Sequence, residues 1–496
     1  MTTPQALDGV RVLDFSTVGP AARCARVLAD YGAEVVKVGA PPRKAAVQIE
    51  PVFHAYAGHR GMKRVRLDLK APEGRDAFLK LAERADVVLE SFRPGVVDRL
   101  GIGYADVSAL NPRIVYCSTS GFGQDGPAAR CARVLADYGA EVVKVGAPPR
   151  KAAVQIEPVF HAYAGHRGMK RVRLDLKAPE GRDAFLKLAE NADVVIESFR
   201  PGVVDRLGIG YADVCALNPR IVYCSTSGFG QDGPAARYAG HDLNYLAVSG
   251  YLACSEPGEG GKPPIPGATL ADSAGGGMHA VIAILAALLR RGRTGRGERL
   301  DVSVADGVLS LMALAVDEHL ATGAEIGPAS GILTGRYAFY DTYAARDGKW
   351  LSLGAIEPQF WANLCRALDL EKWIPHQLDD AVQDEIRADL RAAFAKRDRD
   401  AWVAALAPAD TCVAPVYGVS ELVDDPQFAA RGAFCEAEHP EHGRFRQVAP
   451  VLAGMQKPEA PVPLRTAAET DTEALLREAG IDAESIERMQ REGVVA

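Results

Sequence analysis

The sequence predicts an α/β protein in which helices cover both faces of a parallel sheet. Two observations support this prediction. Short valine-rich apolar segments alternate along the chain with amphipathic helical segments, which is the element order of a doubly wound sheet. The chain also has 496 residues, of which 48% are hydrophobic and 24% charged, and this composition is ordinary for a globular protein with a sizeable core.

Composition disfavours several classes of protein. The chain carries 57 basic and 64 acidic residues, so its formal net charge is −7, and the two signs are interspersed, which argues against a nucleic-acid partner. The first residues lack the pattern of a signal peptide, and the longest apolar run, 278–289, is too short to span a bilayer. We therefore expect a cytoplasmic protein with no membrane partner. The 9 cysteines form neither a CxxC pair nor a Cys/His cluster, so we expect no disulfide and no metal site.

The first elements follow the strand–helix order closely. Residues 10–20, VRVLDFSTVGP, predict a strand that ends in a Gly-Pro turn. The segment 21–33 predicts an amphipathic helix with Gly32 as its stop signal. The segment EVVKVG at 34–39 predicts the next strand. Further along, RVRLDL, DVVLES and RIVYCS predict strands, and the segment PEGRDAFLKLAERA predicts a helix.

An internal duplication dominates this part of the chain. Residues 19–130 recur at 126–237, and the aligned residues differ only at Arg84/Asn191, Leu89/Ile196 and Ser108/Cys215. The pentapeptide GPAAR occurs at 19, 126 and 233, as expected of unequal recombination between short repeats. We call residues 19–125 copy one and residues 126–232 copy two. We interpret them as one recent duplication within a parent of 389 residues (496 − 107), because solenoid repeats are shorter and more diverged.

The chain beyond the duplication continues the alternation. A buried helix is predicted over 275–291, a strand over 299–304 and a helix over 306–320. A strand over 350–356 precedes a helix over 358–370, and the charged, proline-containing segment 457–469 predicts a linker to a final short helix.

Three ionisable residues after the duplication stand beside glycines and are candidates for chemistry. They are His241 in AGHDLNY, Asp272 in LADSAGGG and Glu357 in GAIEPQF. Taken singly, the two acids are most simply explained as helix caps and the histidine as structural. Together they supply two bases and a carboxylate that could orient the histidine, which is what proton abstraction next to a carbonyl requires. Backbone N–H groups at the helix start near Asp272 could hold an oxyanion.

These motifs resemble those of a known family. The segments AGHDLNYLAVSG, LADSAGGG, TGRGERLDVSVADG and GAIEPQFW, with ESFRPGV and NPRIVYCSTSGFGQ in the copies, resemble the α-methylacyl-CoA racemases of the family III CoA-transferase superfamily. The resemblance covers nearly the whole 389-residue parent. It implies a Rossmann-like large domain built from both chain ends, a smaller α+β domain and an interlocked homodimer with the active site between subunits.

The resemblance assigns the roles of the site residues. His241 and Asp272 would be the two bases that remove and return the proton α to an acyl-CoA thioester through an enolate, and Glu357 would hold the His241 imidazole. This reaction would interconvert (2R)- and (2S)-2-methylacyl-CoA in lipid metabolism. It implies no metal or redox cofactor, because CoA is part of the substrate.

The resemblance also suggests where CoA binds. The arginine of the FRPG motif corresponds to Arg93 and Arg200, and the lysine of the EVVKV strand corresponds to Lys37 and Lys144. Residues of the YCSTSGFG motif that would line the thioester pocket are Thr119, Ser120, Thr226 and Ser227.

The duplication makes the assignment of the CoA site ambiguous. We favour copy two, with Arg200 and Lys144, because it leads directly into His241. Its first strand would come from VRVLDF at the terminus or from RIVYCS of copy one, and the other copy would form an added lobe with an exposed sheet edge. The domains implied are the N-terminal part of the large domain over 1–301, a linker over 302–340, the small domain over 341–425, and a linker with the C-terminal part of the large domain over 426–496.

Two alternatives stay open. The chain could be a CoA-transferase of the same fold, in which Asp272 acts as the nucleophile and forms an acyl anhydride. The presence of both His241 and Glu357 favours the racemase, because transferases of the superfamily generally lack that pair. The other alternative is an inactive chain that only binds CoA or forms dimers. The segment GILTGRYAFY stands where racemases usually carry a glycine-rich stretch, which leaves the acyl group open.

Overall fold

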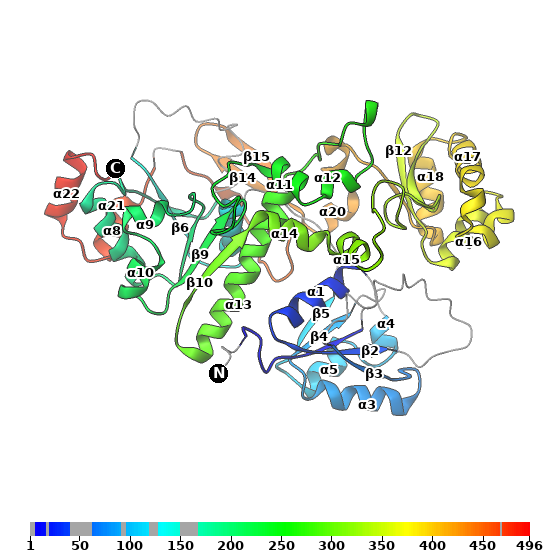
Figure 1. Ribbon diagram of the computed structural model, residues 1–496, viewed down its shortest axis with the longest axis horizontal. Coiled ribbons are helices and arrows are strands. Elements are labelled where there is room, and N and C mark those ends of the chain that lie inside the picture. Colours follow the sequence, from blue (N-terminus) through cyan, green and yellow to red (C-terminus); the bar gives the residue numbers. More distant parts are fainter. Residues whose placement is uncertain are drawn as a thin grey trace.

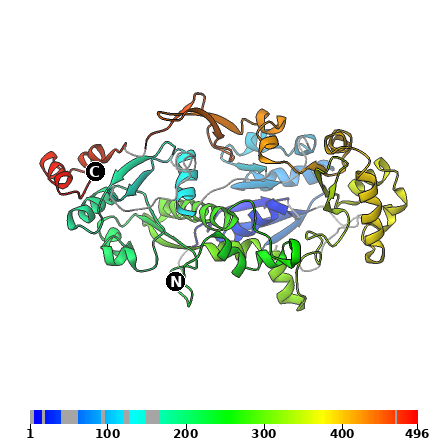
Figure 2. The ribbon, with the colours of Figure 1, turned by 90° about the horizontal axis from the view of Figure 1, so that it is seen from above.

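The computed structural model describes residues 5–15, 19–39, 62–90, 96–118, 127–148, 167–466 and 469–496. Figures 1 and 2 show an elongated molecule with the small domain (yellow) at one end and the C-terminal helices (red) at the other. The two copies form two separate α/β units between these ends, which we call the first lobe (copy one with the N-terminal strand) and the second lobe (copy two with the segments packed on it).

The first lobe is a complete five-stranded parallel sheet. Its strand order is β3-β2-β1-β4-β5, and Val12 at the centre pairs with Val35 on one side and Val87 on the other. Alternation places Val12 and Leu13 on opposite faces, where both are fully buried. Helix α1 packs on one face, and α3 and α5 cover the other. The elements are β1 (Arg11–Asp14), α1 (Gly19–Asp30), β2 (Glu34–Gly39), β3 (Lys63–Arg66), α3 (Pro72–Ala82), β4 (Val87–Glu90), α4 (Val96–Arg99), α5 (Tyr104–Leu110) and β5 (Val115–Ser118).

The second lobe has nearly the same sequence, but its sheet is divided. Strands β8, β9 and β10 form one parallel sheet, and within the described ranges β6 pairs with β7 alone. In the first lobe β1 lies between β2 and β4, whose duplicates are β6 and β8. Among the described residues, no strand lies between β6 and β8 in the same way. The elements are α6 (Pro127–Asp137), β6 (Val143–Gly146), β7 (Lys170–Arg173), α8 (Pro179–Glu190), β8 (Val194–Glu197), α9 (Val203–Leu207), α10 (Tyr211–Leu217), β9 (Val222–Ser227) and β10 (Glu298–Ser303).

The single N-terminal strand explains this difference. We expected VRVLDF or RIVYCS to supply the first strand of copy two, but VRVLDF forms β1 of the first lobe and RIVYCS forms β5 beside β4. The loss of a neighbour shortens β6, which begins at Val143, two residues later than the equivalent position in β2. It also exposes side chains: Val88, on β4 beside β1, is fully buried, whereas its duplicate Val195 is half-buried.

The C-terminal segment packs against the second lobe. The backbone N–H of Arg171 donates to the Asp471 carboxylate at 2.8 Å, and Leu174 forms a bridge with Val495. Helices α21 (Thr472–Glu478) and α22 (Ala483–Arg491) bury Leu476 and Met489 in this contact. The sequence predicted one final helix, but there are two, because Gly480 adopts a positive φ of 83° between them.

Helix α13 (His279–Thr294) packs against β9 and β10 and buries apolar side chains between itself and these strands. It buries Ala280 and Ile284 against Val222 and Val302 of these strands, with Cys131 of α6 closing the cluster. In the described part of the chain, one helical run, Ala271–Thr294, is long and apolar enough by length and composition to cross a membrane. Half of its most apolar window is buried inside the protein, as in a core helix.

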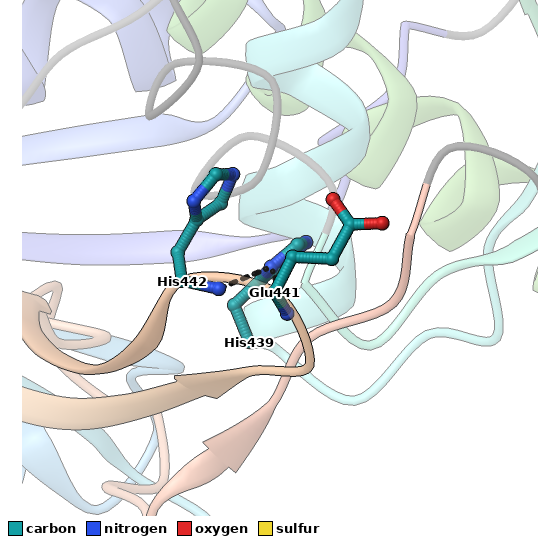
Figure 3. Close-up of side chains that lie close together, drawn as sticks. All are labelled: His439, Glu441 and His442. Atoms are coloured by element: carbon teal, nitrogen blue, oxygen red, sulfur yellow. Dashed lines mark hydrogen bonds between the residues drawn. The ribbon is translucent and has the colours of Figure 1, made fainter.

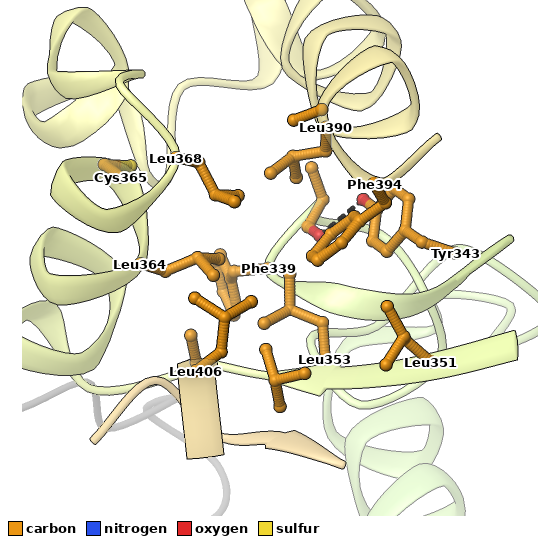
Figure 4. Close-up of a cluster of buried hydrophobic side chains, with 14 of the residues drawn as sticks. Phe339, Tyr343, Leu351, Leu353, Leu364, Cys365, Leu368, Leu390, Phe394 and Leu406 are labelled. Carbon is orange, nitrogen blue, oxygen red and sulfur yellow. Dashed lines mark hydrogen bonds between the residues drawn. The ribbon is translucent and has the colours of Figure 1, made fainter. Parts of the chain in front are cut away.

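The small domain is an antiparallel sheet covered by helices. Strands β11 (Tyr340–Ala344), β12 (Trp350–Gly354) and β13 (Val413–Pro415) pair in that order, and α16 (Pro358–Ala367), α17 (Gln383–Phe394) and α18 (Arg399–Leu406) pack over them. Figure 4 shows the apolar core between these layers. The sequence predicted that α16 continues to Leu370, but the helix ends at Ala367 and the backbone turns at Asp369, which has a positive φ of 58°.

The remaining elements connect the lobes and the small domain. The predicted helix over 306–320 is divided in two at Met312, whose φ and ψ of −83° and 0° interrupt the helix. A three-stranded sheet in the order β15-β14-β16 precedes the C-terminal helices. These elements are α11 (Asp242–Val248), α12 (Tyr251–Cys254), η1 (Glu259–Gly261), η2 (Ala271–Met278), α14 (Val304–Leu311), α15 (Ala313–Thr322), η3 (Glu371–His376), η4 (Asp380–Val382), η5 (Ala407–Ala409), α19 (Val419–Leu422), α20 (Pro426–Ala430), β14 (Phe434–His439), β15 (Gly443–Val448) and β16 (Val462–Pro463).

Candidate active site

Asp272 lies in the first turn of η2, a π-helical segment that leads into α13. Its glycines allow η2 to pack directly on α14: a Cβ at Gly275 would lie 2.8 Å from the Val304 carbonyl oxygen, and one at Gly307 would lie 1.9 Å from the Gly275 carbonyl oxygen. The glycine run therefore fixes Asp272 against α14. π-Helical turns of this kind occur frequently at functional sites.

His241 is joined to Asp272 through the next residue in its motif. His241 is the N-cap residue of α11, and its backbone N–H donates to the Asn244 side chain at 2.9 Å. The carboxylate of Asp242 accepts a hydrogen bond from the backbone N–H of Asp272 at 2.8 Å. The start of α11 is thereby tied to the start of η2, and the His241 side chain stands exposed at this junction.

Tyr245 completes this junction, although the sequence analysis did not select it. Its ring is buried, and its hydroxyl donates to the Gly240 carbonyl oxygen at 2.6 Å. A Cβ at Gly228 would lie 2.3 Å from the Tyr245 hydroxyl oxygen, so the ring occupies space that only glycine leaves. Burial, and secondly the negative charge of Asp272, raise the pKa of Tyr245. Its position four residues after His241, one helical turn along α11, was the available sequence signal.

We expected an oxyanion site at the backbone N–H groups near Asp272, and three of these groups donate hydrogen bonds within the protein. The N–H of Asp272 donates to Asp242, that of Ser273 donates to the Thr269 carbonyl at 3.1 Å, and that of Leu270 donates to the Ala268 carbonyl at 2.9 Å. These donors are engaged within the protein, so the negative oxygen of an enolate would need other partners.

Glu357 lies in the small domain. It is the N-cap residue of α16, where its carbonyl oxygen accepts hydrogen bonds from the N–H groups of Phe360 and Trp361. Its side chain is exposed, and among the described residues no hydrogen bond or ion pair joins it to His241. The structure thus brings His241 and Asp272 together within one chain and leaves Glu357 on a separate unit.

The expected thioester-pocket residues of copy two lie at the end of β9. Thr226 is buried, and its hydroxyl donates to the Glu197 carbonyl at 3.2 Å. Ser227 is half-buried, and its hydroxyl oxygen accepts from the Gln231 side chain at 3.4 Å. Thr119 and Ser120 of copy one lie outside the described residues.

A cavity of about 370 Å³ opens beside the FRPG motif of copy two. The two residues after Arg200 and the segment around Gln231 line it. Four charged residues also line it: Arg237, Arg299, Asp205 and Asp232. Arg200 itself is exposed beside this cavity. Arg93, its counterpart in copy one, lies outside the described residues. Sequence reasoning did not select Arg237 and Arg299, because they stand outside the FRPG motif.

The two duplicate lysines have different environments. Lys37 on β2 is buried, and its ammonium group forms an ion pair with Asp14 of β1 at 2.7 Å. Lys144 on β6 is exposed, because no β1 strand lies beside β6. Among the two predicted CoA-binding lysines, only Lys144 therefore presents an accessible side chain.

A cluster of metal-binding residue types lies outside this junction. His439, Glu441 and His442 on the β14–β15 turn bring one potential ligand atom each to within 4.8 Å of one another (Figure 3), a grouping that the sequence analysis did not identify. The Nδ1 atom of His439 accepts hydrogen bonds from the backbone N–H groups of Glu441 and His442 at 3.1 and 3.3 Å. Because this lone pair holds the turn together, the turn itself explains the cluster.

Comparisons of the sequence and of the structure with known proteins agree on one family. The sequence profile of CoA-transferase family III matches residues 7–132 and again residues 128–466, so the two matches meet where copy two begins. The chain is 34% identical over 372 residues to human α-methylacyl-CoA racemase, which covers 74% of this chain and 94% of that protein. It is 32% identical over 316 residues to acetyl-CoA:oxalate CoA-transferase of Acetobacter aceti, which covers 60% and 79% of the two chains. A crystal structure of Rv3272 from Mycobacterium tuberculosis superimposes with a TM-score of 0.59 at 28% identity, over 70% of this chain and 94% of that one.

Proposed function

This chain belongs to CoA-transferase family III, and we propose that within this family it is a racemase of 2-methylacyl-CoA thioesters. The observation that carries the proposal is the hydrogen bond between Asp242 and the backbone of Asp272, which holds the His241 and Asp272 motifs at one junction. The similarity to the human racemase over 94% of that protein's length supports the same reaction.

The proposed reaction uses the two side chains as bases on opposite faces of the substrate. One of them takes the α-proton, and the electrons of the C–H bond move to the thioester oxygen and form an enolate. The other gives a proton to the opposite face, and the electrons return to form the new C–H bond. The thioester makes the α-proton acidic, and a base and an acid within reach lower the barrier further. The reaction requires neither a metal nor a redox cofactor.

The second lobe provides cations for the CoA phosphates in this proposal. Arg237 and Arg299 line the cavity beside Arg200, and arginine is well suited to binding phosphate oxygens in pairs. Lys144 is accessible on the same lobe. We propose that Arg200 and the two cavity arginines form the phosphate site, and that Glu357 reaches His241 across the interface of a homodimer.

A CoA-transferase remains the second candidate. The relatives include transferases at 32% and 30% identity, and Asp272 is the residue that would form the acyl anhydride. In that reaction the Asp272 carboxylate attacks the thioester, and CoA leaves as the thiolate from the resulting mixed anhydride. The thiolate attacks the Asp272 carbonyl, which releases the first carboxylic acid and leaves a CoA thioester on Asp272. The acceptor carboxylate displaces the thiolate from Asp272 to form a second anhydride, and the thiolate then attacks its acyl carbonyl, which gives the new acyl-CoA and frees Asp272. The transferase needs Asp272 but neither His241 nor an exchangeable α-proton.

One NMR experiment separates the two candidates. The purified protein is incubated with a (2R)-2-methylacyl-CoA in D2O, beside the Asp272→Ala variant and beside a tube that also holds a free carboxylic acid. A racemase replaces the α-proton by deuterium and forms the 2S epimer, and the variant forms no 2S epimer. Formation of the CoA thioester of the added acid, with the α-proton retained, would overturn the racemase in favour of the transferase.

A further inference from the structure

Copy two repeats the two strands that flank β1 in the first lobe, but the sequence contains the β1 segment only once. In the first lobe, β1 lies between β2 and β4. Copy two repeats both neighbours as β6 and β8, and among the described residues neither pairs with a strand on the side that would face β1. We call the position of β1 in the first lobe slot one and the equivalent position between β6 and β8 slot two.

The two slots offer β1 nearly the same contacts. Every residue that pairs with β1 in slot one is repeated in slot two, apart from the exchange of Leu89 for Ile196. Moving β1 from one slot to the other removes two strand neighbours and restores two of almost the same sequence. The backbone hydrogen bonds lost and gained are therefore equal in kind, and two packings of such similar energy can both be populated.

The burial of side chains differs between the two copies, as expected if β1 lies in slot one and not in slot two. Val35 and Val88 are buried beside β1, whereas their duplicates Val142 and Val195 are half-buried. Lys37 pairs with Asp14 at the end of β1, whereas Lys144 is exposed. A β1 strand in slot two would cover these valines and place Asp14 beside Lys144.

The N-terminal segment already reaches the second lobe. The guanidinium of Arg293, in the last turn of α13, donates to the carbonyl oxygens of Ala6 and Asp8, just before β1. Helix α13 packs against β9, which pairs with β8 on the side away from slot two. The segment that leads into β1 thus stays in contact with the second lobe while β1 occupies slot one.

We propose that β1 exchanges between slot one and slot two of its own chain, and that the slot-two state completes the sheet that carries the active site. This second part rests on the proposed function. Ligands of parallel α/β sheets bind at the carboxyl ends of the strands. β9 ends at Ser227, Arg200 follows the end of β8, and Lys144 lies within β6. A divided sheet holds these residues on two separate pieces, so the slot-one state is the less active one.

Cysteine cross-linking tests the exchange without reference to activity. Val12→Cys is combined with Val35→Cys to report slot one and with Val142→Cys to report slot two, and Val12→Cys alone is the control for the native cysteines. After mild oxidation, peptide mass spectrometry identifies the linked pair, and a non-reducing gel separates links within a chain from links between chains. We expect both links to form within a chain. A link to Val142→Cys that is absent, or that forms only between chains, would overturn the proposal.

The duplication supplies matched variants that shift the balance. Val88→Asp places a carboxylate on β4, opposite Leu13 of β1 in slot one, and Val195→Asp places the same group at the equivalent position of β8, beside slot two. Each should change the ratio of the two cross-links about tenfold away from the altered slot, because an unpaired buried charge is strongly unfavourable. Val88→Thr and Val195→Thr make the same comparison with a nearly isosteric residue if an aspartate variant fails to fold. A ratio that none of these variants changes would overturn the exchange.

The same variants connect the exchange to the proposed reaction. α-Proton exchange should rise with Val88→Thr and fall with Val195→Thr, in step with the slot-two cross-link. Cross-links that shift in a protein with no α-proton exchange would support the strand exchange and contradict the racemase proposal. Activity that stays constant while the cross-links shift would overturn the claim that slot two completes the active site.

Discussion

The carboxylate of Asp242 accepts a hydrogen bond from the backbone N–H of Asp272 at 2.8 Å, across 30 residues of sequence. This contact ties the N-terminus of α11, where His241 stands, to the first turn of η2. It makes Asp242 a positioning residue for the two proposed bases.

Replacing Asp242 tests this positioning role. Asp242→Ala should lower kcat/KM for α-proton exchange about tenfold or more, because a hydrogen bond to a charged group is lost and η2 can shift. Asp242→Asn should recover most of the activity, since its amide oxygen still accepts the Asp272 N–H. Equal loss in both variants, with unchanged thermal stability, would show that the charge of Asp242 matters and its hydrogen bond does not.

The duplicate lysines should differ in their effect on stability. Lys37→Met removes the Asp14–Lys37 ion pair, which is nearly inaccessible to water. It should destabilise the slot-one state by up to about 3–5 kcal/mol, and the free energy of unfolding should fall by the part of this loss that movement of β1 to slot two does not recover. Lys144→Met, the same change in the same local sequence, should have an effect within about 0.5 kcal/mol, as expected for exposed positions. Urea denaturation of the two variants measures the difference. Equal values would mean that β1 pairs with both copies to the same extent.

Two glycines should respond to alanine in opposite directions. Gly275→Ala would place its Cβ 2.8 Å from the Val304 carbonyl oxygen and should destabilise the protein by about 1–3 kcal/mol. Gly292→Ala meets nothing within 4 Å in helix α13 and should stabilise it by about 0.5–1 kcal/mol. Thermal unfolding of both variants checks the prediction. A tolerated Gly275→Ala would show that α14 can move away from η2.

Stability of the small domain should depend on the ionisation of Glu421. Arg399 binds its carboxylate with two guanidinium nitrogens at 3.0 and 2.7 Å, and Lys349 adds a contact at 2.8 Å. The Arg399 hydrogen bonds, and then that of Lys349, hold the pKa of Glu421 well below its ordinary value. Because the pKa is lower in the folded state, this stabilisation is complete above the unfolded-state pKa and is lost as the pH falls below it.

Thermal unfolding between pH 7 and pH 3 measures this dependence. Glu421→Gln should be less stable than the unaltered protein at pH 7 and should lose less stability on acidification. The control is Asp384→Asn, which alters a fully exposed carboxylate beside Arg387. If the unfolding temperatures of the Glu421→Gln variant and of the unaltered protein fall in parallel with pH, the pH dependence does not come from Glu421.

Local patterns in the sequence predicted most of the fold. The valine-rich segments became parallel strands, and the α/β class with parallel sheets is confirmed, because side-chain alternation and helix ends are local properties. The sequence did not predict which copy pairs with β1, because the two copies offer it nearly identical neighbouring strands. The placement of β1 depends on packing between segments that are distant in the sequence, which local patterns do not encode.

The sequence was less informative about the site. Motif spacing selected His241 and Asp272, and the structure places them at one junction. Asp242 stands out in the sequence as an ionisable residue beside His241, but its hydrogen bond to Asp272 and the role of Tyr245 were not predictable, because these contacts depend on the approach of α11 to η2. The engaged N–H groups around Asp272 were also unpredictable, since a helix start was expected and a π-helical turn formed.

Proton exchange in variants that lack one base tests the central claim most directly. Each epimer of a 2-methylacyl-CoA is incubated in D2O with His241→Gln and with Asp272→Asn, and NMR follows both the α-proton and the configuration. With two bases on opposite faces, each variant should exchange the α-proton of one epimer only, the two variants should prefer opposite epimers, and neither should racemise. Racemisation retained in either variant, or loss of exchange for the same epimer in both, would contradict the two-base mechanism.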